Sequence, residues 1–70
     1  MIPLNLARPG DEASVKKIGG SDETRRFLEK LGFVSGARLS VVTENNGCMI
    51  VVVKETRVAV SREMAMKIMI

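Results

Sequence analysis

The apolar residues between positions 21 and 33 recur at the spacing of an amphipathic helix. The stripe at i, i+1 and i+4 consists of Phe27, Leu28 and Leu31. Ser21 stands where a helix N-cap is favoured. Gly32 falls where the chain must turn in the left-handed conformation after a helix, and Phe33 follows it to pack back on the helix. The pattern predicts one helix over residues 21–31.

Short apolar runs with the two-residue period of β-strands surround this helix. They cover residues 3–6, 11–18, 37–44, 48–54, 57–60 and 68–70. In the first run Leu4 and Leu6 share one face, and in the second a slip in phase before Ile18 indicates a bulge or bend. Ser61 is placed to cap a short helical turn near residues 62–66. Five to six short strands, with the helix after the second, fit a mainly β fold built as a small, strongly bent barrel.

Asn46 and Gly47 stand between two apolar runs and predict a two-residue hairpin turn. Pairing outward from this turn places Val41 opposite Val52 and Val42 opposite Val51. The expected core face then carries Leu39, Val41, Ile50 and Val52, and the second face carries Val42, Met49, Val51 and Val53. The second face is too apolar for open solvent, so either the chain itself or a partner must cover it.

Composition and charge favour one small folded domain over residues 1–70. Hydrophobic residues make up 46% of the chain, which argues against disorder. The net charge of +3 is spread over interleaved acids and bases, and the two phenylalanines are the only aromatic residues. Both features weaken the case for nucleic-acid binding. A single cysteine and the lack of a signal peptide or an apolar span indicate the cytoplasm.

The residue types needed for catalysis are scarce. The chain has no histidine, and Cys48 has no basic neighbour in sequence that would activate it as a nucleophile. The adjacent carboxylates of Asp11–Glu12 and Asp22–Glu23 are typical of solvated turn and helix-start residues. We therefore expect no catalytic residue, no cofactor and no dedicated metal site, although direct binding of iron or another transition metal stays open.

The ordered set of these features resembles the FeoA family of bacterial ferrous iron uptake. The residues that carry the resemblance are Leu4, Leu6, Gly10, Val15, Ile18 and Gly20, then the Arg-rich helix with Leu31-Gly32-Phe33 and Gly36, then Val58-Ala59-Val60, Ala65 and Ile68. The family often has a glycine in the turn before its last long strand. Here Lys54-Glu55-Thr56 has none, so that turn is expected to differ in shape.

The resemblance implies an SH3-like barrel that acts as a regulatory or assembly partner, not as an enzyme. The implied partner is FeoB, a membrane ferrous iron transporter with a cytosolic G domain. A partner surface is expected around Arg25, Arg26 and Phe33, with Phe33 also anchoring the corner after the helix. The second hairpin face (Val42, Met49, Val51 and Val53) is the other candidate, and a homo-oligomer is a further possibility. The alternative function is a nucleic-acid-binding or iron-repressor-type module, because the same barrel occurs in iron-dependent repressors.

Overall fold

The structure, a computed structural model, describes all 70 residues. It contains a 3-10 helix, two α-helices and six strands: η1 (Leu4–Leu6), β1 (Glu12–Ser14), β2 (Lys17–Ile18), α1 (Asp22–Lys30), β3 (Arg38–Asn45), β4 (Cys48–Val53), β5 (Thr56–Ser61), α2 (Arg62–Ala65) and β6 (Ile68–Met69). The mainly β prediction with one helix after the second strand and a helical turn before the last is confirmed.

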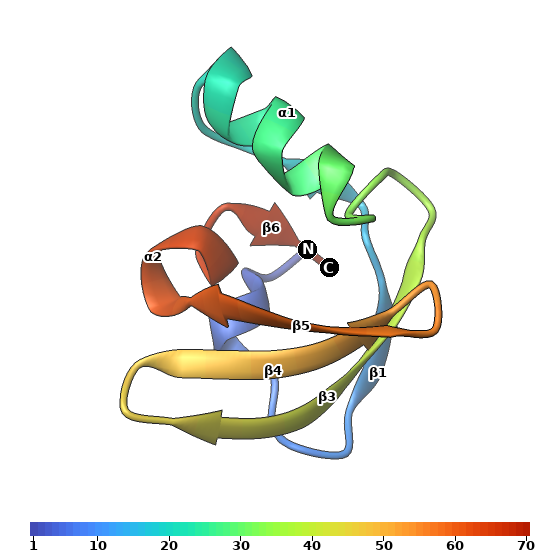
Figure 1. The fold of residues 1–70 in the computed structure, drawn as a ribbon, viewed down its shortest axis with the longest axis vertical. Helices are drawn as coiled ribbons and strands as arrows, with labels where there is room; N and C mark the ends of the chain where they lie inside the picture. Colours follow the sequence, from blue (N-terminus) through green and yellow to red (C-terminus); the bar gives the residue numbers. More distant parts are fainter.

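The strands form two antiparallel sheets that bend around a common core. Four strands pair in the order β1-β3-β4-β5, and the short β2 pairs with β6. Figure 1 shows α1 at one end of the molecule and the β3–β4 hairpin at the other. The two chain ends lie together, because Ile2 and Ile70 exchange backbone hydrogen bonds of 3.0 and 2.8 Å.

The N-terminal third departs from the predicted strands in two places. Residues Leu4–Leu6 form a 3-10 turn, not a strand, so Leu4 is buried and Leu6 is 60% exposed. The phase slip before Ile18 is a full break: the first part pairs with β3 and the second with β6. A backbone that leaves one sheet for another cannot keep a single alternation of faces.

The β3–β4 hairpin has the predicted turn but not the predicted register. Asn45 pairs with Cys48 across Asn46-Gly47, and both turn residues have positive φ, as the favoured hairpin turns require. A β-bulge at Val42 then shifts the pairing by one residue, so Val41 lies opposite Val51. The predicted partners Val52 for Val41 and Val51 for Val42 are therefore wrong.

The bulge also reverses the predicted faces of β4, whereas Leu39 and Val41 are buried as predicted. An extra residue in one strand moves every residue beyond it to the other side relative to the partner strand. Leu39 and Val41 consequently share the core face with Met49, Val51 and Val53, while Ile50 and Val52 are only partly buried. Buried and more exposed residues therefore alternate along β4, and the face with Met49, Val51 and Val53 lines the barrel interior.

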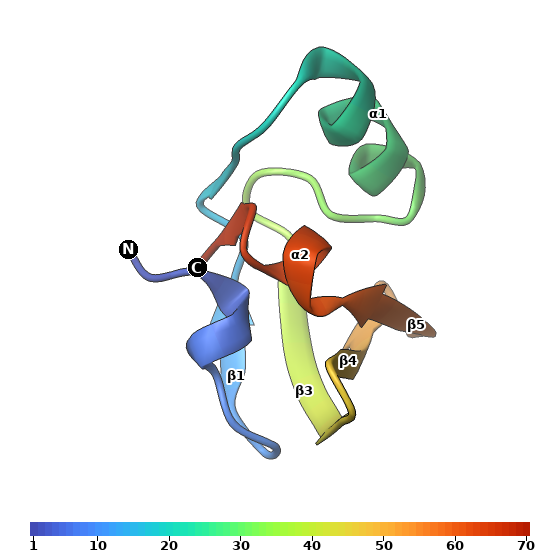
Figure 2. The same ribbon diagram turned by 90° about the vertical axis from the view of Figure 1, so that its left-hand side faces the viewer.

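One apolar cluster fills that interior, and it contains no buried polar or charged residue. Its members are Leu4, Ala7, Val15, Ile18, Leu28, Phe33, Leu39, Val41, Met49, Val51, Val53, Val60, Ala65 and Ile68. Phe33 is fully buried, which confirms its predicted role at the corner after α1. Figure 2 shows α1 over one end of this barrel and α2 beside its middle.

Helix α1 begins and ends at the predicted signals. The Ser21 hydroxyl accepts the Thr24 amide N–H at 3.2 Å. At the other end the Phe33 N–H donates to the Leu28 carbonyl and the Gly32 N–H to the Glu29 carbonyl, both at 3.0 Å. This pair of bonds is the Schellman motif, which needs a left-handed residue, and Gly32 has φ +108°.

None of the helices in this structure has both the length and the apolar character that a membrane-spanning helix requires.

Candidate partner-binding surface

Helix α1 projects from the barrel and buries only one of its nine residues, Leu28. Thr24 and Leu31 are partly buried, so the buried stripe runs at i, i+4 and i+7. Phe27, which the sequence places on the stripe, is 50% exposed. Neighbouring helix residues point about 100° apart, and the barrel lies on the Leu28 side only. The outer face of α1 therefore carries an exposed aromatic ring.

The two arginines of α1 lie at the surface but in different settings. Arg25 forms an ion pair with Asp22, with 2.6 Å between Nη2 and Oδ1. Arg26 is exposed and belongs to neither of the two ion pairs in the structure. Lys30 is one turn further along from Arg26. We call Arg26, Phe27 and Lys30, together with Arg25, the α1 outer face. These residues bring basic groups and an accessible ring, and the exposed acids Glu23 and Glu29 lie on the same helix.

The remaining residues of the predicted partner surface are not gathered at this face. Phe33, Met49, Val51 and Val53 are at most 1% exposed, so a partner cannot reach them in the folded protein. The bulge in β3 turns Met49, Val51 and Val53 toward the core, and Phe33 is buried at the corner after α1. Val42 is the bulge itself and is 37% exposed. It belongs to β3 and not to α1.

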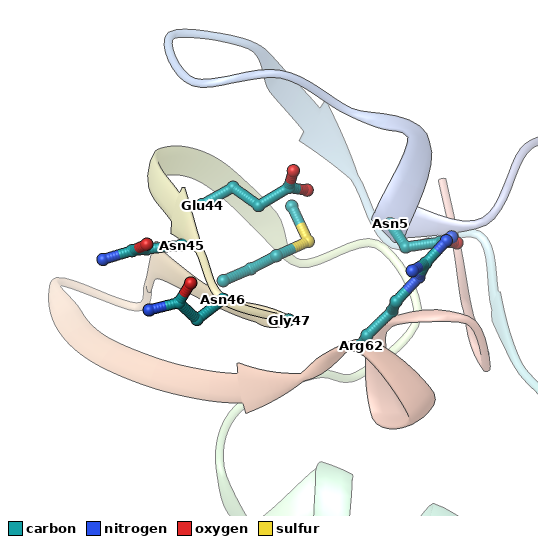
Figure 3. A pocket seen from close by; sticks show the side chains of 7 residues that line it. Asn5, Glu44, Asn45, Asn46, Gly47 and Arg62 are labelled. Carbon is teal, nitrogen blue, oxygen red and sulfur yellow. The ribbon is translucent and has the colours of Figure 1, made fainter.

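A second surface feature, a polar pocket of about 320 Å³, was not predicted. Its walls come from the hairpin end, η1 and the start of α2, and the residues lining it are Asn5, Glu44, Asn45, Asn46, Gly47, Met49 and Arg62. In Figure 3 Glu44 and Arg62 extend from opposite sides of the pocket, with Asn5 beside Arg62. Residues so far apart in sequence carry no local signal of a shared site. Phe27 was detectable in principle, since Thr24, Leu28 and Leu31 already form a complete helical stripe.

Neither feature is a set of catalytic groups. No three His, Cys, Asp or Glu side chains lie close enough to hold a metal ion, and Cys48 is a free, exposed thiol. What the two surfaces offer is charge, hydrogen-bonding groups and one aromatic ring, which are suited to binding.

The bent six-stranded barrel with α1 over one end has the architecture of an SH3-like protein. A solved structure described as an iron uptake regulatory protein (FeoA) superimposes with a TM-score of 0.90 at 29% identity, covering 96% of this chain and 91% of that one. A manganese-dependent transcriptional repressor superimposes with a TM-score of 0.87 at 23% identity, covering 94% of this chain but 38% of the repressor, which shows a common fold only.

Sequence comparison agrees with the structural match to FeoA. The chain is 37% identical over 70 residues to a protein of Methanocaldococcus jannaschii described as "Putative Fe(2+) transport protein A", covering 100% of this chain and 85% of that protein. The model of the FeoA domain matches residues 2–70. The chain belongs to the FeoA family, as its sequence pattern indicates, and this is a family of small accessory proteins of iron transport.

Proposed function

We propose that this protein is a cytoplasmic regulatory partner of a FeoB-type ferrous iron transporter and acts by direct contact with the transporter's G domain. Family membership supports the connection to ferrous iron transport. The observation that carries the contact is the α1 outer face, where an unpaired arginine adjoins a phenylalanine that is 50% exposed. The protein works by binding, not by catalysis.

The α1 outer face has the chemistry of a contact site. Arginine and aromatic residues are enriched among the residues that dominate binding energy at protein interfaces. Phe27 offers apolar area that folding leaves accessible, and Arg26 offers a guanidinium that can pair with a carboxylate. The expected complement is an acidic surface with an apolar depression. Arg25 is already paired with Asp22 and is expected to contribute less.

The test is a calorimetric titration of the protein with the soluble G domain of its cognate transporter. Phe27→Ala is expected to weaken binding about tenfold or more, as for a central interface residue, and Arg25→Ala combined with Arg26→Ala by a similar factor. Arg57→Ala is the matched control, because Arg57 is exposed on β5, outside the α1 outer face. Equal affinity of all these variants would remove α1 from the interface. No heat of binding from the wild type would refute direct contact with the G domain.

The alternative is a nucleic-acid-binding or iron-repressor-type module. The structural match to the repressor favours it at the level of the fold. Charge opposes it, because the 11 basic residues are interleaved with eight acidic ones. Binding to a DNA duplex that weakens steeply with added salt would favour this alternative over transporter contact.

A further inference from the structure

The polar pocket between the hairpin tip, η1 and α2 has walls that the backbone holds in place. The Arg62 N–H donates to the Gly47 carbonyl at 2.7 Å and so ties the start of α2 to the hairpin turn. The Ser61 hydroxyl caps α2 by accepting the Met64 N–H at 3.2 Å. Asn5 belongs to η1, which is anchored by the fully buried Leu4. The pocket is therefore a fixed feature of the fold.

The pocket carries one charge of each sign, and neither is neutralised inside the protein. Glu44 and Arg62 extend from opposite sides (Figure 3), and neither takes part in the two ion pairs of the structure. Neither side chain forms a hydrogen bond within the chain. An acceptor and a donor of opposite charge thus face a common space.

Asn5 adds a polar side chain to the lining of the pocket. Its side-chain oxygen Oδ1 is buried and has no hydrogen-bond partner. A buried acceptor without a donor is costly, and such groups are uncommon in native proteins. Asn5 lines the pocket beside Arg62 (Figure 3), although its oxygen is closed off from the pocket space.

We propose that this pocket binds a small zwitterion, with an ammonium group and a carboxylate joined by a short carbon chain, as in a free amino acid. The ammonium group pairs with the Glu44 carboxylate, and the carboxylate accepts from the Arg62 guanidinium on the other side of the pocket. A volume of about 320 Å³ accommodates a molecule of this size. The proposal does not depend on the transporter as a partner.

The test is an NMR titration of ¹⁵N-labelled protein with three zwitterions of increasing charge separation: glycine, β-alanine and 6-aminohexanoate. The expected result is that amide shifts concentrate at Asn5, Glu44, Gly47 and Arg62, with one chain length preferred. Acetate and ethylammonium, which carry one charge each, are expected to bind about tenfold or more weakly, because each forgoes a charge-assisted hydrogen bond. Equal binding of acetate or ethylammonium, shifts elsewhere, or no shift with any zwitterion would overturn the proposal.

Variants of the two charged residues make the test specific. Glu44→Gln and Arg62→Gln remove one charge each at exposed positions and are each expected to weaken the preferred zwitterion about tenfold or more. Arg57→Gln is the matched control and should bind as the wild type does, since Arg57 does not line the pocket. Unchanged binding in both pocket variants would refute the assigned contacts.

A capped Lys-Asp dipeptide, with both termini blocked, distinguishes two sources of this ligand chemistry. It carries the same two charges on neighbouring side chains. If the dipeptide binds with the same dependence on Glu44 and Arg62, the site also binds paired charges on a polypeptide. If only free zwitterions bind, the ligand is a small molecule. Both results support the proposed chemistry.

Discussion

Replacing Gly32 with alanine isolates the energetic cost of the turn from α1 into the barrel. Gly32 has φ +108°, a conformation that residues with a side chain rarely adopt. An added Cβ would stand 3.5 Å from Val53 Cγ1 and 3.6 Å from Lys54 Cδ, which is ordinary van der Waals contact. The loss therefore comes from the backbone and not from a steric clash. We expect unfolding to become easier by about 1–3 kcal/mol.

The assay is urea unfolding followed by far-UV circular dichroism, because the chain has no tryptophan or tyrosine for fluorescence. In a domain of this size each kcal/mol corresponds to a change of about 4–8 °C in Tm, so thermal melts provide a second reading. A small domain has little stability to spare, and the effect should be plain in both measurements.

Gly19→Ala is the control for this experiment. Gly19 does not have a positive φ, and an added Cβ there would meet only the Lys67 carbonyl oxygen at 3.7 Å. Alanine at this site should leave stability unchanged or raise it by about 0.4–1 kcal/mol, by restricting the unfolded chain. If Gly32→Ala unfolds at the same urea concentration as Gly19→Ala, the left-handed turn is not the source of the glycine requirement.

Two further substitutions test the hairpin faces and the second turn. Val51→Lys should unfold the barrel, because it places an unpaired charge at a position with 0% exposure. Val42→Lys, at the 37% exposed bulge, should keep the wild-type ¹⁵N–¹H spectrum. The reverse result would favour the register without the bulge. Lys54 and Glu55 form a two-residue turn with φ +51° and +64°, where glycine is unstrained. Glu55→Gly should therefore raise the urea midpoint by an amount corresponding to about 1 kcal/mol. An unchanged or lower midpoint would mean that the Glu55 backbone carries no strain.

The Lys54-Glu55 turn shows how the fold accommodates a missing glycine. The sequence indicates a turn of different shape, since Lys54-Glu55-Thr56 lacks glycine. The structure places both non-glycine residues in the left-handed region, between the paired residues Val53 and Thr56. The stem of Lys54 lies beside Gly32, with Cδ and Cγ 3.6 and 3.7 Å from the position of an added Cβ. The packing of the Lys54 side chain beside Gly32 thus accompanies a left-handed backbone conformation that non-glycine residues disfavour.

Local sequence signals are enough to predict the features that depend on a few neighbouring residues. Ser21 and Gly32 set the ends of α1, because capping and a left-handed turn act within one helical turn. Asn46-Gly47 set the hairpin turn for the same local reason. The order of elements also sufficed to indicate the FeoA family, which the comparisons confirm.

Long-range packing determines which residues face the core and which stay exposed. The pattern of apolar residues fits the β3–β4 pairing with or without a bulge at Val42. The structure has the bulge, and Met49, Val51 and Val53 therefore face the interior. The exposure of Phe27 depends on where the barrel lies relative to α1. The pocket lined by Asn5 and Arg62 forms because segments far apart in sequence pack against each other. Local preferences of the chain do not determine which distant segments come together.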